Sequence, residues 1–424
     1  MTSPDELRNT LVAMATQARR ASRRLAVMTT EEKNAVLHAI ADGLVAGQDR
    51  ILEANAQDLS DAAEAGLSAA LIDRLRLTPE RLEALADDVR HVAGLPDPIG
   101  TVIEEFEGAK GIRIRKVSVP IGVIAIIFES RPNVTVDAAV LCLKSGNATL
   151  LRGGKEAIHS NLALAAVLQD AGAQAGLPEG AVQVVASTDR QSVPMLCGLD
   201  GLVDLAIPRG GHGLIEAVVS SARVPVIKHY DGICHVYLDA AADADMAERI
   251  ILNAKCQRPG VCNAAETLLV HAAAAPALLP RIGQALHAAG VELRGDEETR
   301  RILGDGMPVR EATENDWRTE HLALVLGVRV VGSTDEAIAH VNHFGSHHSD
   351  VIVSNDEAAA RRFQAEVDSA TVYWNASTRF TDGGQFGFGA EIGISTDKLH
   401  ARGPMGLREL TSYKYLIDGT GQVR

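Results

Sequence analysis

The feature that most constrains the fold of this chain is an alternation of short β-branched segments with amphipathic helices through residues 111–356. The segment GIRIRKVSVPIGVIAIIFE (111–129) predicts an exposed strand followed by a buried one. Further strands are predicted at 148–154, 181–187, 203–208 and 224–229, with helices between them at 156–176, 193–199 and 213–222. A second block with the same alternation of strands and helices begins at residues 233–243. Both blocks therefore predict parallel sheets that are covered by helices.

The two ends of the chain do not follow this alternating pattern. Residues 1–95 carry apolar side chains three and four positions apart behind capping residues, and this pattern predicts a layer of helices. Residues 409–424 predict one more strand with a frayed end. Because 424 residues are too many for one simple core, two or three domains are expected.

The composition excludes several classes of protein. A net charge of −14 and an aromatic content of 3% argue against a nucleic-acid-binding protein. The sequence contains no run of 18 apolar residues, and residues 1–30 lack the apolar core of a signal peptide, so we expect no membrane segment. Five cysteines without a CxxC motif favour reduced thiols and a cytoplasmic protein over a disulfide framework.

Two cysteines, Cys256 and Cys262, lie six positions apart in the segment NAKCQRPGVCNAAETLLV, and several interpretations remain open. A disulfide between them is disfavoured by the reducing compartment. A buried structural role suits most cysteines, Cys142 and Cys234 among them. A zinc site would need further ligands, and the sequence has no CxxC or HExxH spacing that would fix a tetrahedral geometry. Histidines that could supply such ligands are His340, His343, His347 and His348.

Cys262 differs from the other cysteines because it follows a Pro-Gly turn and precedes an apolar strand. Lys255 and Arg258 are close to it in sequence, and a loop thiol beside positive charge is partly ionised at neutral pH. A thiolate attacks acyl and carbonyl carbons and divides one difficult step into two easier ones. A nucleophile on a turn is therefore a further interpretation of Cys262.

Three polar loops follow predicted strands and could bind anions. The segment LLRGGKEAIHSN places Arg152 and Lys155 around a Gly-Gly turn, and IPRGGHGLI repeats the arrangement with Gly210 and Gly211. Backbone N–H groups at such a helix start attract phosphate, and two such turns at the ends of parallel strands favour a dinucleotide site. The alternative is that each is an ordinary tight turn. In the third loop, Arg131 could clamp an anion and Asn133 could stabilise an oxyanion.

Several segments together resemble the γ-glutamyl phosphate reductases, a branch of the aldehyde dehydrogenase superfamily. They are SRPNVT, LRGGKEA, IPRGG, KCQRPGVCNAAETLLV, NHFGSHHSDVIVS and WNASTRFTDGGQFGFGAEIGIST. The resemblance implies an α/β, aldehyde-dehydrogenase-like fold with two doubly wound α/β domains and a β-strand oligomerisation flap. It implies an NADPH-binding domain in residues 1–230 with an oligomerisation hairpin at 101–119, and a catalytic cysteine domain in 231–370. Residues 371–424 would form a return segment and a C-terminal oligomerisation strand, and the protein would be a homo-oligomer.

The resemblance also implies roles for residues at matching positions. Cys262 would be the nucleophile, and Asn133 would complete the oxyanion hole with the backbone N–H of Cys262. Residues that would contact the cofactor are Arg152, Lys155, Ser187, Thr188, Pro208, Gly210, Gly211 and Glu320. Residues that would line the substrate end are Ser377, Thr378, Arg379, Phe388 and Glu391. Arg131 and Arg258 are cations that we expect to hold the phosphate and carboxylate of the substrate. No metal is expected. His229 stands where hydrolytic relatives place a Glu base, which fits acyl reduction better than aldehyde oxidation.

The implied reaction is the NADPH-dependent reduction of L-glutamyl 5-phosphate to L-glutamate 5-semialdehyde, with release of phosphate, in proline biosynthesis. Lys155 in place of an acid would favour the 2′-phosphate of NADPH. A separate glutamate 5-kinase would supply the substrate, with a possible direct handover. The alternatives are an acylating dehydrogenase that uses a coenzyme A thioester, a plain semialdehyde dehydrogenase, or a scaffold without chemistry.

Overall fold

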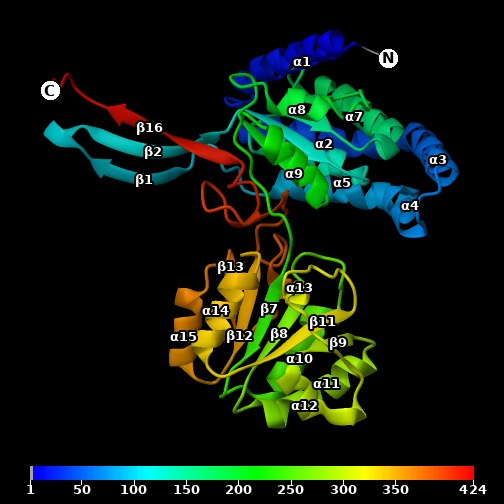
Figure 1. The fold of residues 1–424 in the computed structure, drawn as a ribbon. Helices are drawn as coiled ribbons and strands as arrows, with labels where there is room; N and C mark the ends of the chain where they lie inside the picture. Colours follow the sequence, from blue (N-terminus) through cyan, green and yellow to red (C-terminus); the bar gives the residue numbers. More distant parts are fainter. Residues whose placement is uncertain (1–2) are drawn as a thin grey trace. The chain divides into compact units, whose positions relative to one another are not determined.

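The computed structural model describes residues 3–424, apart from the side chain of residue 305, and divides the chain into two compact units (Figure 1). Unit 1 extends to Lys228 and also contains Gly387–Gly393 and Met405–Arg424. Unit 2 contains His229–Phe386 and Ile394–Pro404. The segment 371–424, predicted to form a return segment and a C-terminal oligomerisation strand, is shared between the two units.

Five helices form the N-terminal part of unit 1, as the sequence pattern predicts. They are α1 (Pro4–Leu25), α2 (Thr30–Ala46), α3 (Gln48–Glu64), α4 (Ala69–Leu75) and α5 (Pro79–Gly94). Ser3 and Thr29 each begin a helix with a capping box, because the hydroxyl accepts from the backbone three residues on and a Glu side chain bonds back. Their buried leucines, isoleucines and alanines pack α2 against α5 and against α7 (Ile158–Gln174).

The sheet of unit 1 has four parallel strands in the order β5-β4-β3-β6. These strands are β3 (Val123–Phe128), β4 (Ala148–Arg152), β5 (Val182–Val184) and β6 (Leu205–Arg209). The helices that follow them are α6 (Asn133–Lys144), η2 (Lys155–Ala157), α7 (Ile158–Gln174), α8 (Ser192–Cys197) and α9 (His212–Ser221). Every residue of β3 is buried, as its continuous apolar run predicts.

The strand predicted at residues 224–229 is wrong. This segment makes only an isolated bridge to β6, in which Ala206 donates to the Pro225 carbonyl and Ile227 donates to the Ala206 carbonyl. Pro225 has no N–H to continue a ladder, so the apolar run does not extend into a strand.

The sheet of unit 2 has seven strands in the order β10-β9-β11-β8-β7-β12-β13, and every neighbouring pair is parallel. The strands are β7 (Cys234–Leu238), β8 (Ala265–His271), β9 (Glu292–Gly295), β10 (Val309–Glu311), β11 (Val325–Val331), β12 (Ser349–Val353) and β13 (Thr371–Trp374). The helices are α10 (Ala244–Cys256), α11 (Ala275–Ala288), α12 (Glu297–Leu303), η3 (Gly304–Gly306), α13 (Glu314–Trp317), α14 (Thr334–Phe344), α15 (Glu357–Glu366) and η4 (Thr378–Phe380).

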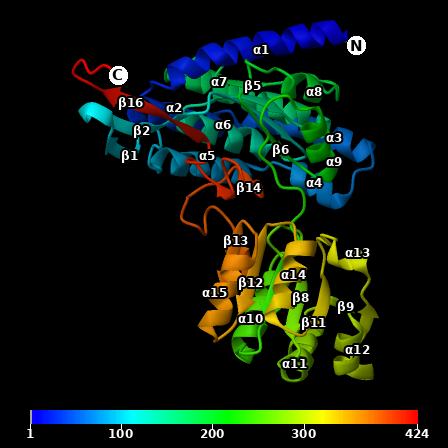
Figure 2. The same cartoon turned by 60° about the vertical axis from the view of Figure 1, so that its left-hand side comes forward.

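Successive side chains of β7 enter two different cores, which shows that both faces of this sheet are covered (Figure 2). Val236 and Leu238 pack with α10 and α11, whereas Tyr237 packs with α14 and α15. The predicted fold class, α/β with doubly wound parallel sheets, is confirmed.

A separate antiparallel sheet joins a hairpin to the C-terminal strand in the order β1-β2-β16 (Figure 1). Its elements are β1 (Val102–Glu107), η1 (Ala109–Gly111), β2 (Arg113–Pro120) and β16 (Thr411–Asp418). All of β1 is exposed, and Tyr413, Tyr415 and Ile417 on β16 are each more than half exposed. A short sheet pairs β14 (Gly393–Ser395) with β15 (Gly403–Met405). Within residues 3–424, each helix is too short or too polar to cross a bilayer.

Candidate active site

Cys262 lies in unit 2 on the turn between α10 and β8, and its thiol is partly exposed and is not in a disulfide. A fully buried ion pair connects the two sides of this turn, because Lys255 Nζ at the end of α10 is 2.7 Å from Glu266 Oε2 on β8. Burial raises the pKa of Glu266 to about 7 and lowers the pKa of Lys255. The pair therefore fixes both ends of the cysteine loop.

The loop before β7 packs directly against the backbone of Cys262. A Cβ atom at Gly232 would collide with the carbonyl group and Cα of Cys262, so only glycine fits there. The Cys234 thiol donates to the Cys262 carbonyl oxygen at 3.2 Å. The Gly232 N–H bonds to the Glu320 carboxylate, and burial raises the pKa of Glu320. Glu320, predicted to hold a ribose, thus also supports the loop that abuts the nucleophile candidate.

The segment around η4 supplies positive charge and buried hydroxyls to the same loop. Asn263 Nδ2 donates to the Thr381 carbonyl at 2.9 Å, and Thr378 Oγ1 donates to the Asn263 carbonyl at 2.7 Å. Arg379 Nε donates to Gln257 Oε1 at 2.9 Å. Burial lowers the pKa of Arg379, and the charges that act on it include Arg258, Asp382 and Cys262.

Four of the predicted substrate residues are therefore brought to the Cys262 loop. Arg379 lies within electrostatic range of the thiol, and Arg258, in the Cys262 loop itself, lies within electrostatic range of Arg379. Ser377 and Thr378 are buried, and their hydroxyls are engaged with the backbone of Arg379 and Asn263. The two arginines are free to act on an anion through charge, whereas the two hydroxyls position the loop.

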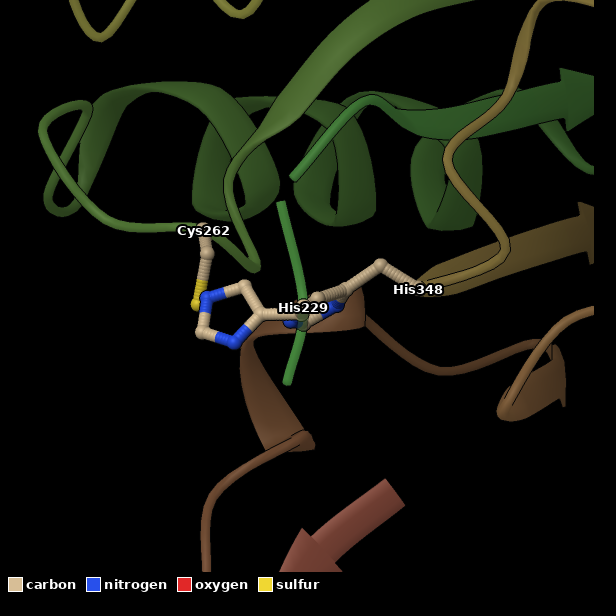
Figure 3. Close-up of side chains that lie close together, drawn as sticks. All are labelled: His229, Cys262 and His348. Carbon is tan, nitrogen blue, oxygen red and sulfur yellow. The ribbon is translucent and has the colours of Figure 1, made fainter. Parts of the chain in front are cut away.

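Two histidines complete the surroundings of Cys262 (Figure 3). One ligand atom each of His229, Cys262 and His348 lies within 4.8 Å of the other two. The rings of His229 and His348 meet edge to face with centroids 5.7 Å apart. His229 Nδ1 is 2.9 Å from the Ile394 carbonyl oxygen, and His348 Nδ1 is 2.8 Å from Ser349 Oγ. Burial lowers the pKa of His348 to about 3, so its imidazole is neutral near pH 7.

The other histidines and the second cysteine of these motifs lie apart from Cys262. His340 is buried against Trp317 and Phe344, and its Nδ1 accepts from Arg329. His343 accepts from Arg318, and His347 Nδ1 bonds to the Asp368 carbonyl. Cys256 ends α10 and packs against the apolar core. The fold thus separates one histidine of the segment from the other three.

Unit 1 contains a cavity of about 670 Å³ beside the carboxyl ends of its strands. The cavity is lined by Arg152, Lys155, Thr188 and Gly211 among the predicted cofactor residues, and also by Glu129, Glu156 and Arg190. Lys155 and Arg190 are exposed cations. A cavity of this size with exposed cations fits a phosphate-bearing nucleotide.

Two of the predicted anion contacts are already engaged within unit 1. The buried Arg152 donates to Ser192 Oγ and to the carbonyls of Gly153 and Thr188, so it holds the loop that follows β5. The Gly211 N–H donates to Glu129 Oε2 at 3.0 Å. The anion attraction of the turn at Gly211 is therefore partly met by a carboxylate of the protein.

The remaining cofactor candidates have structural contacts. Ser187 Oγ accepts from the Asp189 N–H at 3.2 Å. Pro208 is buried in β6 opposite Ile127 of β3. A Cβ atom at Gly210 would meet the ends of the Glu129 and Leu214 side chains, which would have to move to make room for it.

Asn133 begins α6, where its Nδ2 donates to Asp137 Oδ2 at 2.8 Å. Burial raises the pKa of Asp137 to about 6, and the hydrogen bond from Asn133 opposes this shift. Arg131 is exposed beside it. Phe388 is 39% exposed, and it belongs with Glu391 to the segment 387–393 of unit 1.

Sequence reasoning missed Glu266, Asp137, Glu129 and Arg190. Glu266 carries a local signal, since a charged residue inside the apolar run AAETLLV requires a partner when buried. Asp137 stands four positions after Asn133 on a helix, a spacing at which side chains meet. Glu129 and Arg190 reach the cavity from loops, and their places depend on tertiary structure.

Comparison with known proteins agrees with this arrangement. The family model described as "Aldehyde dehydrogenase family" matches residues 2–301. Together with the two parallel-sheet units, this shows that the chain belongs to the aldehyde dehydrogenase family.

Particular relatives place the chain within that family. A gamma-glutamyl phosphate reductase of Carboxydothermus hydrogenoformans is 56% identical over 411 residues, which cover 97% of this chain and 98% of that protein. One from Opitutus terrae is 55% identical over 421 residues, 99% of each chain. The crystal structure of the gamma-glutamyl phosphate reductase of Thermotoga maritima has a TM-score of 0.96 and 48% identity, covering 98% of this chain and 99% of that chain. The resemblance to the gamma-glutamyl phosphate reductase branch is thus confirmed.

Proposed function

We propose that this protein reduces L-glutamyl 5-phosphate to L-glutamate 5-semialdehyde and phosphate, with NADPH as reductant, as a step of proline biosynthesis. The observation that carries the proposal is the Cys262 loop. It presents a partly exposed thiol on a turn, anchored by the Lys255–Glu266 pair and within electrostatic range of Arg379. The relatives named gamma-glutamyl phosphate reductase support the choice of substrate.

The chemistry of the chain begins with the Cys262 thiolate, which attacks the acyl carbon of the substrate and forms a tetrahedral oxyanion. The backbone N–H of Cys262 and the amide of Asn133 are the donors that we assign to that oxyanion. The carbon–oxygen bond to phosphate then breaks, phosphate leaves with the electron pair, and a thioester on Cys262 remains. Hydride addition to the thioester carbon gives a thiohemiacetal, which collapses to the aldehyde and regenerates the thiolate.

Arg258 and Arg379 suit the recognition of the anionic substrate. Arg379 acts near Cys262 and Arg258 acts on Arg379, and a guanidinium binds phosphate or carboxylate through paired donors. Arg131, Phe388 and Glu391 remain proposed substrate contacts from the sequence resemblance. No protein base is required to activate water, because the acyl group passes to the sulfur and then accepts hydride.

The cofactor proposal rests on the cavity of unit 1. The reduced nicotinamide supplies the hydride when the cofactor is bound. Lys155 and Arg190 are the exposed cations of the cavity that could pair with a 2′-phosphate, and Thr188 lines the same space. Glu320 is proposed for the ribose of the nicotinamide. The carboxylate of Glu129 at Gly211 disfavours a phosphate on that single amide, so the pyrophosphate should rest mainly on other donors.

Phosphate dependence of the reverse reaction tests the proposal. With L-glutamate 5-semialdehyde and NADP⁺, formation of NADPH should require inorganic phosphate, because phosphate releases the acyl group from Cys262. Coenzyme A should not replace it, which separates this activity from an acylating dehydrogenase. Oxidation at an equal rate without phosphate would contradict the proposal and would favour a hydrolytic semialdehyde dehydrogenase.

We also propose that the protein is a homo-oligomer that uses the sheet β1-β2-β16. The exposed edge of β1 and the exposed apolar side chains of β16 support this, because such edges pair readily with another strand. A separate glutamate 5-kinase would provide the labile acyl phosphate, and direct handover from it is part of the proposal. The molecular mass of the native protein in solution tests the oligomer.

A further inference from the structure

Three side chains from distant parts of unit 2 converge at the Cys262 loop (Figure 3). His229 precedes β7, Cys262 precedes β8, and His348 precedes β12. Their ligand atoms lie within 4.8 Å of one another. A tetrahedral zinc site with Zn–N of about 2.0 Å and Zn–S of about 2.3 Å separates its ligand atoms by about 3.3 to 3.6 Å. A closure of about 1 Å by side-chain rotation therefore brings the three atoms to bonding positions.

The hydrogen bonds of the two rings decide which nitrogen atoms carry a lone pair toward this cluster. His229 Nδ1 faces the Ile394 carbonyl oxygen, which can only accept, so Nδ1 carries the hydrogen and Nε2 carries the lone pair. His348 Nδ1 bonds to Ser349 Oγ. Both rings are thus held at Nδ1 by a carbonyl or a hydroxyl. This is the outer arrangement that orients imidazole ligands around metal ions.

The burial of His348 gives independent evidence that this cluster can bind a cation. The side chain is fully buried, and its Nε2 atom has no hydrogen-bond partner in the described part of the chain. A buried polar nitrogen without a partner costs free energy, which coordination to a cation would recover. Ser349 holds the other nitrogen within a hydroxyl network that includes Thr371 and Thr381, so the ring is fixed in place.

We propose that His229, Cys262 and His348 bind one thiophilic divalent cation, represented by Zn²⁺. One thiolate and two imidazoles select Zn²⁺ over hard cations such as Mg²⁺, and a fourth position remains for water. Binding forms one Zn–S and two Zn–N bonds and releases the thiol proton to solvent. The spacing of these residues along the chain gives no zinc motif, because the fold alone assembles the set.

The consequence of this site is a reversible block of the nucleophile. A sulfur bound to Zn²⁺ has its electron pair engaged and does not attack an acyl carbon. The positive charge of Arg379 near the thiol limits the affinity, so the ion should be removable by a chelator. The binding itself does not depend on the proposed reaction, whereas the block rests on it.

Metal titration of the full chain tests the proposal. Zn²⁺ should bind the reduced, metal-free protein with one ion per chain by calorimetry, and Mg²⁺ should not. Co²⁺ in the same site should give a thiolate-to-cobalt charge-transfer absorption. His229→Asn and His348→Asn should each weaken Zn²⁺ binding by at least about tenfold, and Cys262→Ser should remove the absorption band.

Two matched variants serve as controls. His347→Asn removes the histidine next to His348, and Cys256→Ala removes the cysteine at the end of α10; both variants should bind Zn²⁺ like the original chain. Circular dichroism checks folding, and if His348→Asn does not fold, His229→Asn decides the outcome. Absence of stoichiometric binding, unchanged affinity in the histidine variants, or a band that persists in Cys262→Ser would each overturn the site. Loss of phosphate-dependent turnover in the metal-free protein would instead count against the proposed reaction.

Discussion

Gly232 lies so close to Cys262 that a Cβ atom at position 232 would be 2.5 Å from the carbonyl carbon of Cys262, and closer still to its oxygen. The two backbones therefore pack without space for any side chain. Because Gly232 also donates its N–H to Glu320, it links a proposed cofactor residue to the proposed nucleophile. The position of the thiol depends on this contact.

The first prediction concerns this contact. Gly232→Ala must displace the Cys262 loop by about 1 Å, and misplacement of a reacting group on that scale can lower the turnover rate about 10²-fold. The matched control is Gly260→Ala in the same loop, where an added Cβ would meet only the Leu322 carbonyl oxygen at 3.8 Å. Turnover numbers of the two variants, measured on folded protein, check the prediction. Equal rates in the two variants would contradict it.

The second prediction concerns the buried ion pair at the base of the loop. Glu266→Gln leaves Lys255 without a counter-charge in a fully buried site, so the free energy of unfolding should fall by about 3 to 5 kcal/mol. Urea unfolding followed by circular dichroism measures it. Replacing both partners, Lys255→Met with Glu266→Leu, should restore most of the stability, because no charge is then left buried. A double variant as unstable as the single one would refute this explanation.

The third prediction is a pH dependence from Asp137. Its folded pKa of about 6 lies above the value of about 3.9 for an unfolded chain, so the folded state binds the proton more tightly. The stability from this group is complete below the unfolded pKa and is lost as the pH rises through the folded pKa. Asn at position 137 does not ionise, so the variant does not lose this stability as the pH rises. Relative to the original chain, the variant should gain up to about 3 kcal/mol between about pH 4 and about pH 7.

Thermal unfolding of both proteins over this pH range provides the comparison for Asp137. Titrations of other groups are common to the two proteins and cancel in the difference. A stability difference that stays constant with pH, or that moves against the variant as the pH rises, would show that Asp137 is ionised in the folded state throughout.

The fourth prediction concerns the preference between cofactors. Lys155→Glu places negative charge in the cavity of unit 1, so the ratio of kcat/KM with NADPH to that with NADH should fall at least about tenfold, or ~1.4 kcal/mol. Arg8→Glu changes the net charge equally on the exposed surface of α1 and should leave the ratio unchanged. If Lys155→Glu also leaves it unchanged, Arg190 becomes the residue to test for the 2′-phosphate.

The sequence predicts the elements of this fold better than their arrangement. Continuous apolar runs such as Val123–Phe128 identify buried strands, because only covered parallel strands exclude polar residues. The strand order of unit 2 does not follow from any local pattern, since each strand could cross over to either side of its neighbour. Pro225 shows that an apolar run alone overestimates a strand when one residue cannot donate.

The candidate site, like the fold, can be predicted only in part from the sequence. The Pro-Gly turn before Cys262 and the arginine at position 258 are local features, and the sequence indicates them correctly as parts of one loop. The approach of Gly232, the Lys255–Glu266 pair and the grouping of His229 with His348 arise only when separate strands come together. Residues 340–348 form one histidine-rich segment in sequence, yet the fold sends His340 and His348 to different surroundings.

Trapping of the acyl group on the protein tests the central claim most directly. When L-glutamyl 5-phosphate is generated in situ and the cofactor is omitted, rapid quenching and mass spectrometry of peptides should find a glutamyl thioester on Cys262. NADPH added before the quench should remove it and yield the semialdehyde. A glutamyl group on Cys256, or the absence of any adduct in a protein that still turns over, would contradict the account.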